Sequence, residues 1–100
     1  MKEVDMMGVN SIINDRPVID GFVTVSPFRI ITTYDDNWVE IVCEQANIRI
    51  LGTDENQAKK MLSRGFKDAW RNYVLCDVRE LSQSALEYRN WLTSHLKVKK

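Results

Sequence analysis

The clearest pattern in the chain is an apolar stripe at helical spacing in its second half. Apolar residues recur there at intervals of three and four, on one face of a 3.6-residue period: Ala58, Met61, Leu62, Phe66, Ala69, Trp70, Tyr73 and Val74. Thr53 can cap the first turn with its hydroxyl, and Asp54 and Glu55 place negative charge where the helix dipole is positive. Gly65 costs about 1 kcal/mol relative to Ala inside a helix, which a helix of this length tolerates. We therefore expect a helix over residues 53–75.

A second and shorter apolar pattern follows a polar break. Ser82 can cap a helix whose apolar face is formed by Ala85, Leu86, Tyr88, Trp91, Leu92 and Leu96. Lys97, Lys99 and Lys100 follow, and cations suit the C-terminus of a helix. We expect this helix over residues 82–97.

Before the first helix the pattern is typical of strands. Residues 22–33 are β-branched and aromatic, although Pro27 interrupts them and requires an edge position or a bulge. Residues 38–43 alternate, which places Val39, Ile41 and Cys43 on one face and Trp38, Glu40 and Val42 on the other. Residues 48–51 form a third short apolar run after a polar turn.

Together these elements predict an α+β fold. A three-stranded antiparallel meander over residues 21–51 is followed by two helices packed on one face of the sheet, βββαα in two layers. Residues 1–20 have weak periodicity, and we expect a partly irregular segment with a short strand or turn. A chain of 100 residues without repeats or linkers makes a single domain, 1–100.

The composition argues against some classes of partner but does not identify the function. The formal net charge is zero, so no global field favours nucleic acid or an anionic membrane. No apolar run approaches the roughly 20 residues that span a bilayer. Residues 1–5 mix charges instead of opening a signal peptide. We therefore expect a cytoplasmic protein without a membrane partner.

The residue types that carry catalysis are scattered. Cys43 and Cys76 lie far apart with no neighbouring His, which argues against zinc and favours reduced structural thiols. His95 is the only histidine, and the sequence indicates no nucleophile or acid beside it. We expect no catalytic residue, no metal site and no cofactor.

Two charged segments are candidates for binding. Lys60, Arg64, Lys67 and Arg71 are spaced by four, three and four residues, so they form one basic stripe along the first helix. Such a stripe can contact the phosphates of a nucleic acid or an acidic partner. The alternative is an ordinary solvated face opposite the apolar one.

The predicted hairpin carries the opposite charge. Asp35, Asp36, Glu40 and Glu44 lie in a stretch without Lys or Arg, which suits docking of a basic protein. Trp38 alternates with the inward residues, and an exposed Trp is an interface candidate. The alternative is a charged turn that only keeps the protein in solution.

Several short motifs resemble HicB-like antitoxins. They are residues 38–41 (WVEI) and 48–58 (IRILGTDENQA), where a strand ends in Gly52 and Thr53 before the helix opens. Residues 73–82 (YVLCDVRELS), with the later ALE and WL, resemble an extension found in some small bacterial relatives. The resemblance covers residues 22–95.

The resemblance implies a partial RNase H-like fold without nuclease activity, and binding to a small basic RNA-cleaving toxin. The chain departs from the family's pattern, because only one helix and a Lys tail follow the first helix where a DNA-binding module is usual.

From this we expect a non-enzymatic, antitoxin-like module that occludes a small basic partner protein through Asp35, Asp36, Trp38, Glu40 and Glu44. The alternative is a nucleic-acid-binding or regulatory protein that uses the basic stripe. A homodimer is a further possibility, because a small domain rich in aromatic residues can complete its core by pairing.

Overall fold

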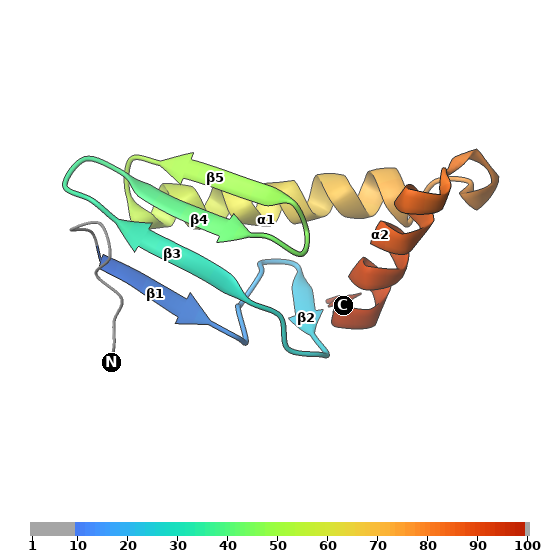
Figure 1. Ribbon diagram of the computed structural model, residues 1–100, viewed down its shortest axis with the longest axis horizontal. Helices are drawn as coiled ribbons and strands as arrows, with labels where there is room; N and C mark the ends of the chain where they lie inside the picture. The colour runs from blue at the N-terminus through green and yellow to red at the C-terminus, as the bar shows by residue number, and fades with distance from the viewer. Residues whose placement is uncertain (1–9, 100) are drawn as a thin grey trace.

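A four-stranded antiparallel sheet forms the centre of the molecule. The computed structural model describes residues 10–99, and Figure 1 shows their arrangement. The strands of this main sheet are β1 (Asn10–Asn14), β3 (Ile30–Tyr34), β4 (Val39–Cys43) and β5 (Ile48–Gly52), in the order β1-β3-β4-β5. The meander of β3, β4 and β5 was predicted. For residues 1–20 only a short strand or turn was expected, and that β1 joins the sheet as its fourth strand was not predicted.

The helix α1 (Glu55–Tyr73) lies behind the sheet in Figure 1 and packs mainly against β5 and β4. Its buried residues are Ala58, Leu62, Ser63, Phe66 and Ala69. The prediction of Thr53 as the cap is wrong by one residue: Asp54 is the N-cap, and its carboxylate accepts from the backbone N–H of Gln57. Thr53 instead donates its hydroxyl and its N–H to the Gln57 side-chain oxygen.

A small second sheet joins two distant parts of the chain. β2 (Phe22–Thr24) pairs antiparallel with β6 (Leu96–Val98). The predicted strand over residues 22–33 is therefore two strands in two sheets, separated by the loop that holds Pro27. The predicted helix over residues 82–97 is too long, because α2 (Gln83–His95) ends where β6 begins.

The second helix does not share the sheet face with α1, contrary to the prediction. After the 3-10 turn η1 (Val78–Glu80), α2 lies beyond the end of the main sheet and packs against α1 and β6. Tyr88 connects it to the turn between β4 and β5, because its hydroxyl donates to the Ala46 carbonyl oxygen over 2.7 Å. Ser82 caps α2 as predicted.

One continuous core links these parts. The alternation in β4 is confirmed, because Val39, Ile41 and Cys43 are buried beneath Phe66 and Leu62 of α1. The core continues to Phe28, Leu92 and Leu96, so α2 and β6 close one end of it. Within residues 10–99, no helix has the length and apolarity required to cross a membrane. The predictions for residues 1–9 and Lys100 fall outside the described residues.

Candidate functional site

The face of the main sheet opposite α1 is left uncovered by the described chain (Figure 1). We call it the outer face. Strand alternation and register define its residues: Ser11, Ile13, Ile31, Thr33, Trp38, Glu40, Val42, Arg49 and Leu51. Solvated faces of antiparallel sheets are normally polar, yet each of the four strands contributes an apolar side chain to this one. Leu51 is 59% exposed and Ile13 is 50% exposed.

Three of these apolar residues form a row across the sheet. Ile13 pairs with Ile31, which pairs with Val42, and directly opposed side chains on a sheet are in contact distance. We call them the apolar row. Arg49 of β5 is the next residue in this line, and its guanidinium forms an ion pair of 3.5 Å with Glu40.

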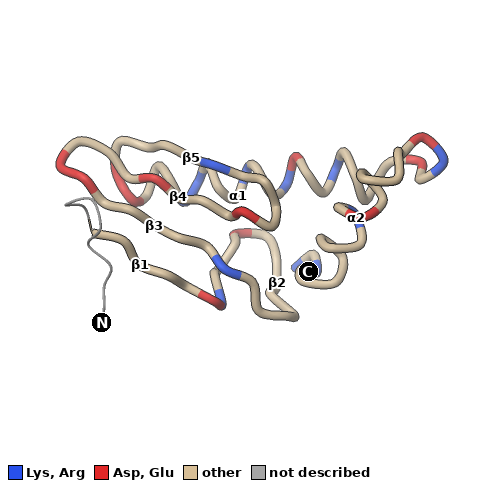
Figure 2. Tube along the Cα trace, in the orientation of Figure 1, with Lys and Arg blue, Asp and Glu red and all other residues tan. Residues whose placement is uncertain are grey.

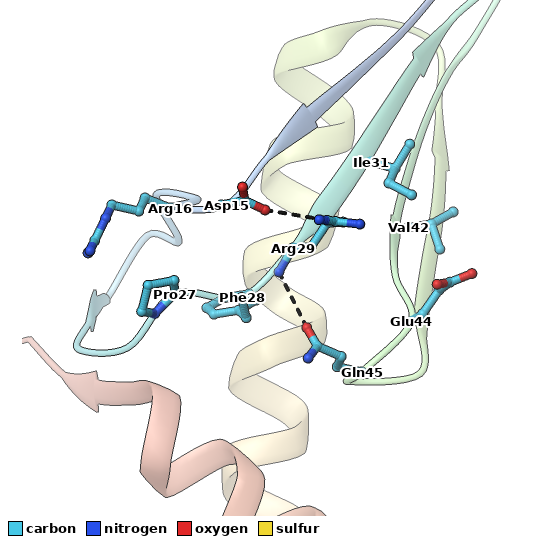
Figure 3. Close-up of a pocket in the computed structure, with 9 residues that line it drawn as sticks. All are labelled: Asp15, Arg16, Pro27, Phe28, Arg29, Ile31, Val42, Glu44 and Gln45. Carbon is cyan, nitrogen blue, oxygen red and sulfur yellow. Dashed lines mark hydrogen bonds and ion pairs between the residues drawn. The ribbon is translucent and has the colours of Figure 1, made fainter. Parts of the chain in front are cut away.

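A shallow pocket of about 600 Å³ continues from the apolar row. Ile31 and Val42 line it, with Pro27 and Phe28 from the loop after β2 (Figure 3). At its rim, the Arg29 Nε and the Asp15 Oδ1 atoms lie 3.4 Å apart. The Arg29 backbone N–H donates to the side-chain oxygen of Gln45 over 3.3 Å. The pocket therefore combines an apolar floor with a partly paired polar rim.

The predicted acidic residues spread along the outer face and do not form one cluster. Asp35 and Asp36 lie in the β3–β4 turn at one end (Figure 2), and Glu44 lines the pocket at the other. Trp38 and Glu40 lie between them. Trp38 is half-buried rather than fully exposed. Glu40 is paired with Arg49, which leaves Asp35, Asp36 and Glu44 without an ion pair among the described residues.

The predicted basic stripe lies along one side of a groove. Lys60, Arg64, Lys67 and Arg71 all line a hollow between α1 and the inner face of β1 and β3, and Figure 2 shows the cations distributed along α1. Sequence reasoning placed the four residues on one face correctly but missed the groove. It also missed Lys59 and Ile12, which line the same hollow.

Three groups with reactive side chains, Cys43, Tyr88 and His95, lie in or against the core. Cys43 and Cys76 are free thiols, as predicted, and burial raises the pKa of Cys43. The His95 ring stacks on Trp91, and its Nδ1 lies 2.8 Å from the Trp91 carbonyl oxygen. Burial, with smaller contributions from Tyr73 and Cys43, raises the pKa of Tyr88 to about 12. Among residues 10–99, no group of three or more His, Cys, Asp or Glu side chains is placed to hold a metal ion.

The apolar row had a signal in the sequence that was not used. The same alternation that placed Val42 outward, continued through the pairing partner of β4, would have placed Ile31 outward as well. The position of Ile13 required knowledge that β1 joins the sheet.

No protein-family description, no curated protein and no solved structure matches this chain. The resemblance to HicB-like antitoxins therefore stays a prediction.

Proposed function

We propose that this protein is a non-enzymatic binding module that docks a small basic protein on its outer face. The observation that carries the proposal is the apolar row on an uncovered sheet face. Exposed apolar patches of this kind mark interaction sites more often than chance. Trp38 adds a large aromatic side chain at the edge of the same surface, and Trp is enriched among residues that dominate binding energy.

The charges around the outer face favour a basic partner. Asp35 and Asp36 are exposed at one end and Glu44 is exposed at the other, about 20 Å away along the strand. A partner with an apolar centre and Lys or Arg on both sides would place its cations against these carboxylates. Charges at the rim of an interface steer association and select partners more than they add affinity.

The resemblance to HicB-like antitoxins supports one form of this function, in which the partner is a small basic toxin and the complex forms in the cytoplasm. The quoted strand–Gly–Thr–helix motif lies at the β5–α1 connection, where Gly52 is buried against the first turn of α1. That motif connects β5 to α1, so its role is structural. The docking surface proposed here lies on the opposite side of the sheet.

Recovery of the partner from the native host tests the proposal. The tagged wild-type chain is compared with Trp38→Ala and Val42→Lys, which alter the outer face, and with the matched control Val78→Lys in η1. Val78 is also an exposed apolar residue. Thermal melting confirms that each variant is folded.

We expect the wild-type chain and the control to retain a small protein of high isoelectric point. Trp38→Ala should weaken its binding by about thirtyfold, which corresponds to the roughly 2 kcal/mol of an interface hot spot. Recovery of no basic partner, or of one that binds all four chains equally, would reject the proposal.

A further inference from the structure

A second surface, the groove beside α1, is separate from the outer face. It is about 1000 Å³ in volume and lies between α1 and the inner face of β1 and β3. It exists because α1 packs over β4 and β5 and leaves the other half of the sheet open. Ile12 of β1 is 56% exposed there, although its side chain points to the same side of the sheet as the core.

The dimensions of the open half suit one helix. Two neighbouring strands span about 9.6 Å, and a helix with its side chains is about 10 Å across. Helices pack side by side at 8–10 Å between axes. A helix on β1 and β3 would therefore contact α1 along its length and complete the usual two-layer packing of a four-stranded sheet. α2 is not in this position, because it packs at the end of the core.

The floor of the groove is apolar and its side wall is basic. Ile12, Thr32 and Tyr34 line the floor, and Leu62 contributes from α1. The cations that line the groove are Lys59, Lys60, Arg64, Lys67, Arg71 and Lys99, and the carboxylates are Asp20, Glu55 and Asp68. Among residues 10–99, six cations against three carboxylates leave an excess of three positive charges in the groove.

Three of the cations are already paired. Lys59 with Glu55, Lys67 with Asp20, and Arg71 with Asp68 form ion pairs at 3.0, 3.8 and 2.8 Å. Lys60, Arg64 and Lys99 have no ion-pair partner within residues 10–99. Exposed pairs of this kind are worth little, so carboxylates from a ligand could compete with them.

We infer that the groove is a docking site for an amphipathic helix of a partner protein that carries acidic residues on one flank. Its apolar stripe would cover Ile12 and Tyr34, and its acidic flank would face Lys60 and Arg64. A nucleic acid fits the groove less well, because its phosphates gain nothing from the apolar floor that the apolar stripe of a helix would cover.

A second copy of this chain also lacks the required chemistry. Its α1 is the basic helix itself, and its α2 carries one carboxylate and one guanidinium, Glu87 and Arg89. The inference does not depend on the proposed function, since the outer face and the groove lie on opposite sides of the sheet.

Selection from a displayed library of helical peptides tests the inference. Helical peptides of about 14 residues span the length of the strands that form the floor. All exposed positions are randomised, and binders of the folded wild-type chain are enriched. We expect sequences with an apolar stripe and an acidic flank.

Affinities of the enriched peptides are then compared across variants by fluorescence anisotropy. The double variant Lys60→Glu/Arg64→Glu should weaken binding by at least about tenfold, or roughly 1.4 kcal/mol. Arg79→Glu/Lys97→Glu, which reverses two exposed cations outside both the groove and the outer face, is the matched control and should change nothing. Ile12→Lys should also weaken the binding of the peptides, because it removes part of the apolar floor. The same variant adds a cation to the groove.

Ile12→Lys separates the two ligand classes. A labelled single-stranded oligonucleotide would bind this variant more tightly than the wild type if the groove recognised phosphate. The inference is overturned if the oligonucleotide binds the groove more tightly than the enriched peptides, or if the enriched peptides lack an acidic flank. It is also overturned if the wild-type chain is a dimer in solution that the groove variants dissociate, because the occupant would then be a second copy.

Discussion

The two halves of the main sheet differ in what lies on their inner face. Over β4 and β5, the helix α1 buries Val39, Ile41 and Cys43 almost completely. On β1 and β3, Thr32 and Tyr34 are only half-buried and Ile12 is exposed. One helix is wide enough to cover two strands but not four. The covered half therefore holds most of the core residues of the sheet, to which β3 adds Ile30 at one end. The rest of the open half leaves apolar and charged side chains available to a partner.

Truncation of one apolar residue in each half gives the largest expected contrast. Phe66 is fully buried and packs on Phe28 with ring centroids 5.8 Å apart, so Phe66→Ala should cost about 3–5 kcal/mol in the free energy of unfolding. Ile12→Ala should change it by no more than about 0.5 kcal/mol. Urea denaturation measures both. A cost above 2 kcal/mol for Ile12→Ala would show that the open half is covered in solution. The two halves of the sheet would then not differ as described.

The second contrast lies within the covered half, where α1 begins against β5. A Cβ on Gly52 would lie 2.8 Å from the backbone nitrogen of Ala58, too close for either backbone to accept without a shift. We expect Gly52→Ala to lower the free energy of unfolding by about 1–3 kcal/mol, the range for overpacked cores. An unchanged urea midpoint would mean that α1 can move away from β5 at little cost.

Sequence reasoning succeeded for the covered half because its signals are local. The apolar spacing of α1 and the alternation of β4 each depend on residues within one element, and Asp54 replaced Thr53 as the cap only by a shift of one position. The location of the open half is not a local property. It depends on which two strands α1 covers, and four strands with one helix allow more than one choice.

The second sheet illustrates the same limit. Phe22 pairs with Val98 at the other end of the chain, and each of the two strands has only three residues. So short a strand has too few positions to show a reliable alternation. Residues 22–33 therefore predicted one strand, and Leu96 was assigned to the apolar face of a helix although it opens β6. The groove and the apolar row could not be seen before these pairings were known.

A smaller effect is expected where α2 attaches to the covered half. The Tyr88 hydroxyl donates to the Ala46 carbonyl oxygen, so Tyr88→Phe should cost about 1 kcal/mol at neutral pH. Burial raises the pKa of Tyr88 to about 12 from 10.0. The unfolded chain therefore ionises first, and this contribution to stability is complete below pH 10 and is lost as the pH rises towards 12.

Urea denaturation between pH 8 and pH 12 separates Tyr88 from other groups that titrate there. The wild-type chain should lose stability more steeply than Tyr88→Phe above pH 10, so that the difference between the two chains shrinks. Parallel curves would show that Tyr88 is not held neutral by the fold.

The smallest expected effect has the opposite sign and lies in the middle of α1. A Cβ on Gly65 would lie 3.6 Å from the Ile48 Cγ2 atom, which is ordinary van der Waals contact. Gly65→Ala should therefore raise the free energy of unfolding by up to about 1 kcal/mol, because Ala is the better helix former.

The same substitution at Gly52 and Gly65 thus serves as a matched pair, measured by the shift in the urea midpoint. If both destabilise, α1 lies closer to β5 along its whole length than the 3.6 Å contact at Ile48 indicates, and the covered half has no spare volume. If the two substitutions change the free energy of unfolding in opposite directions, the close contact is confined to the first turn of α1, next to the end of β5.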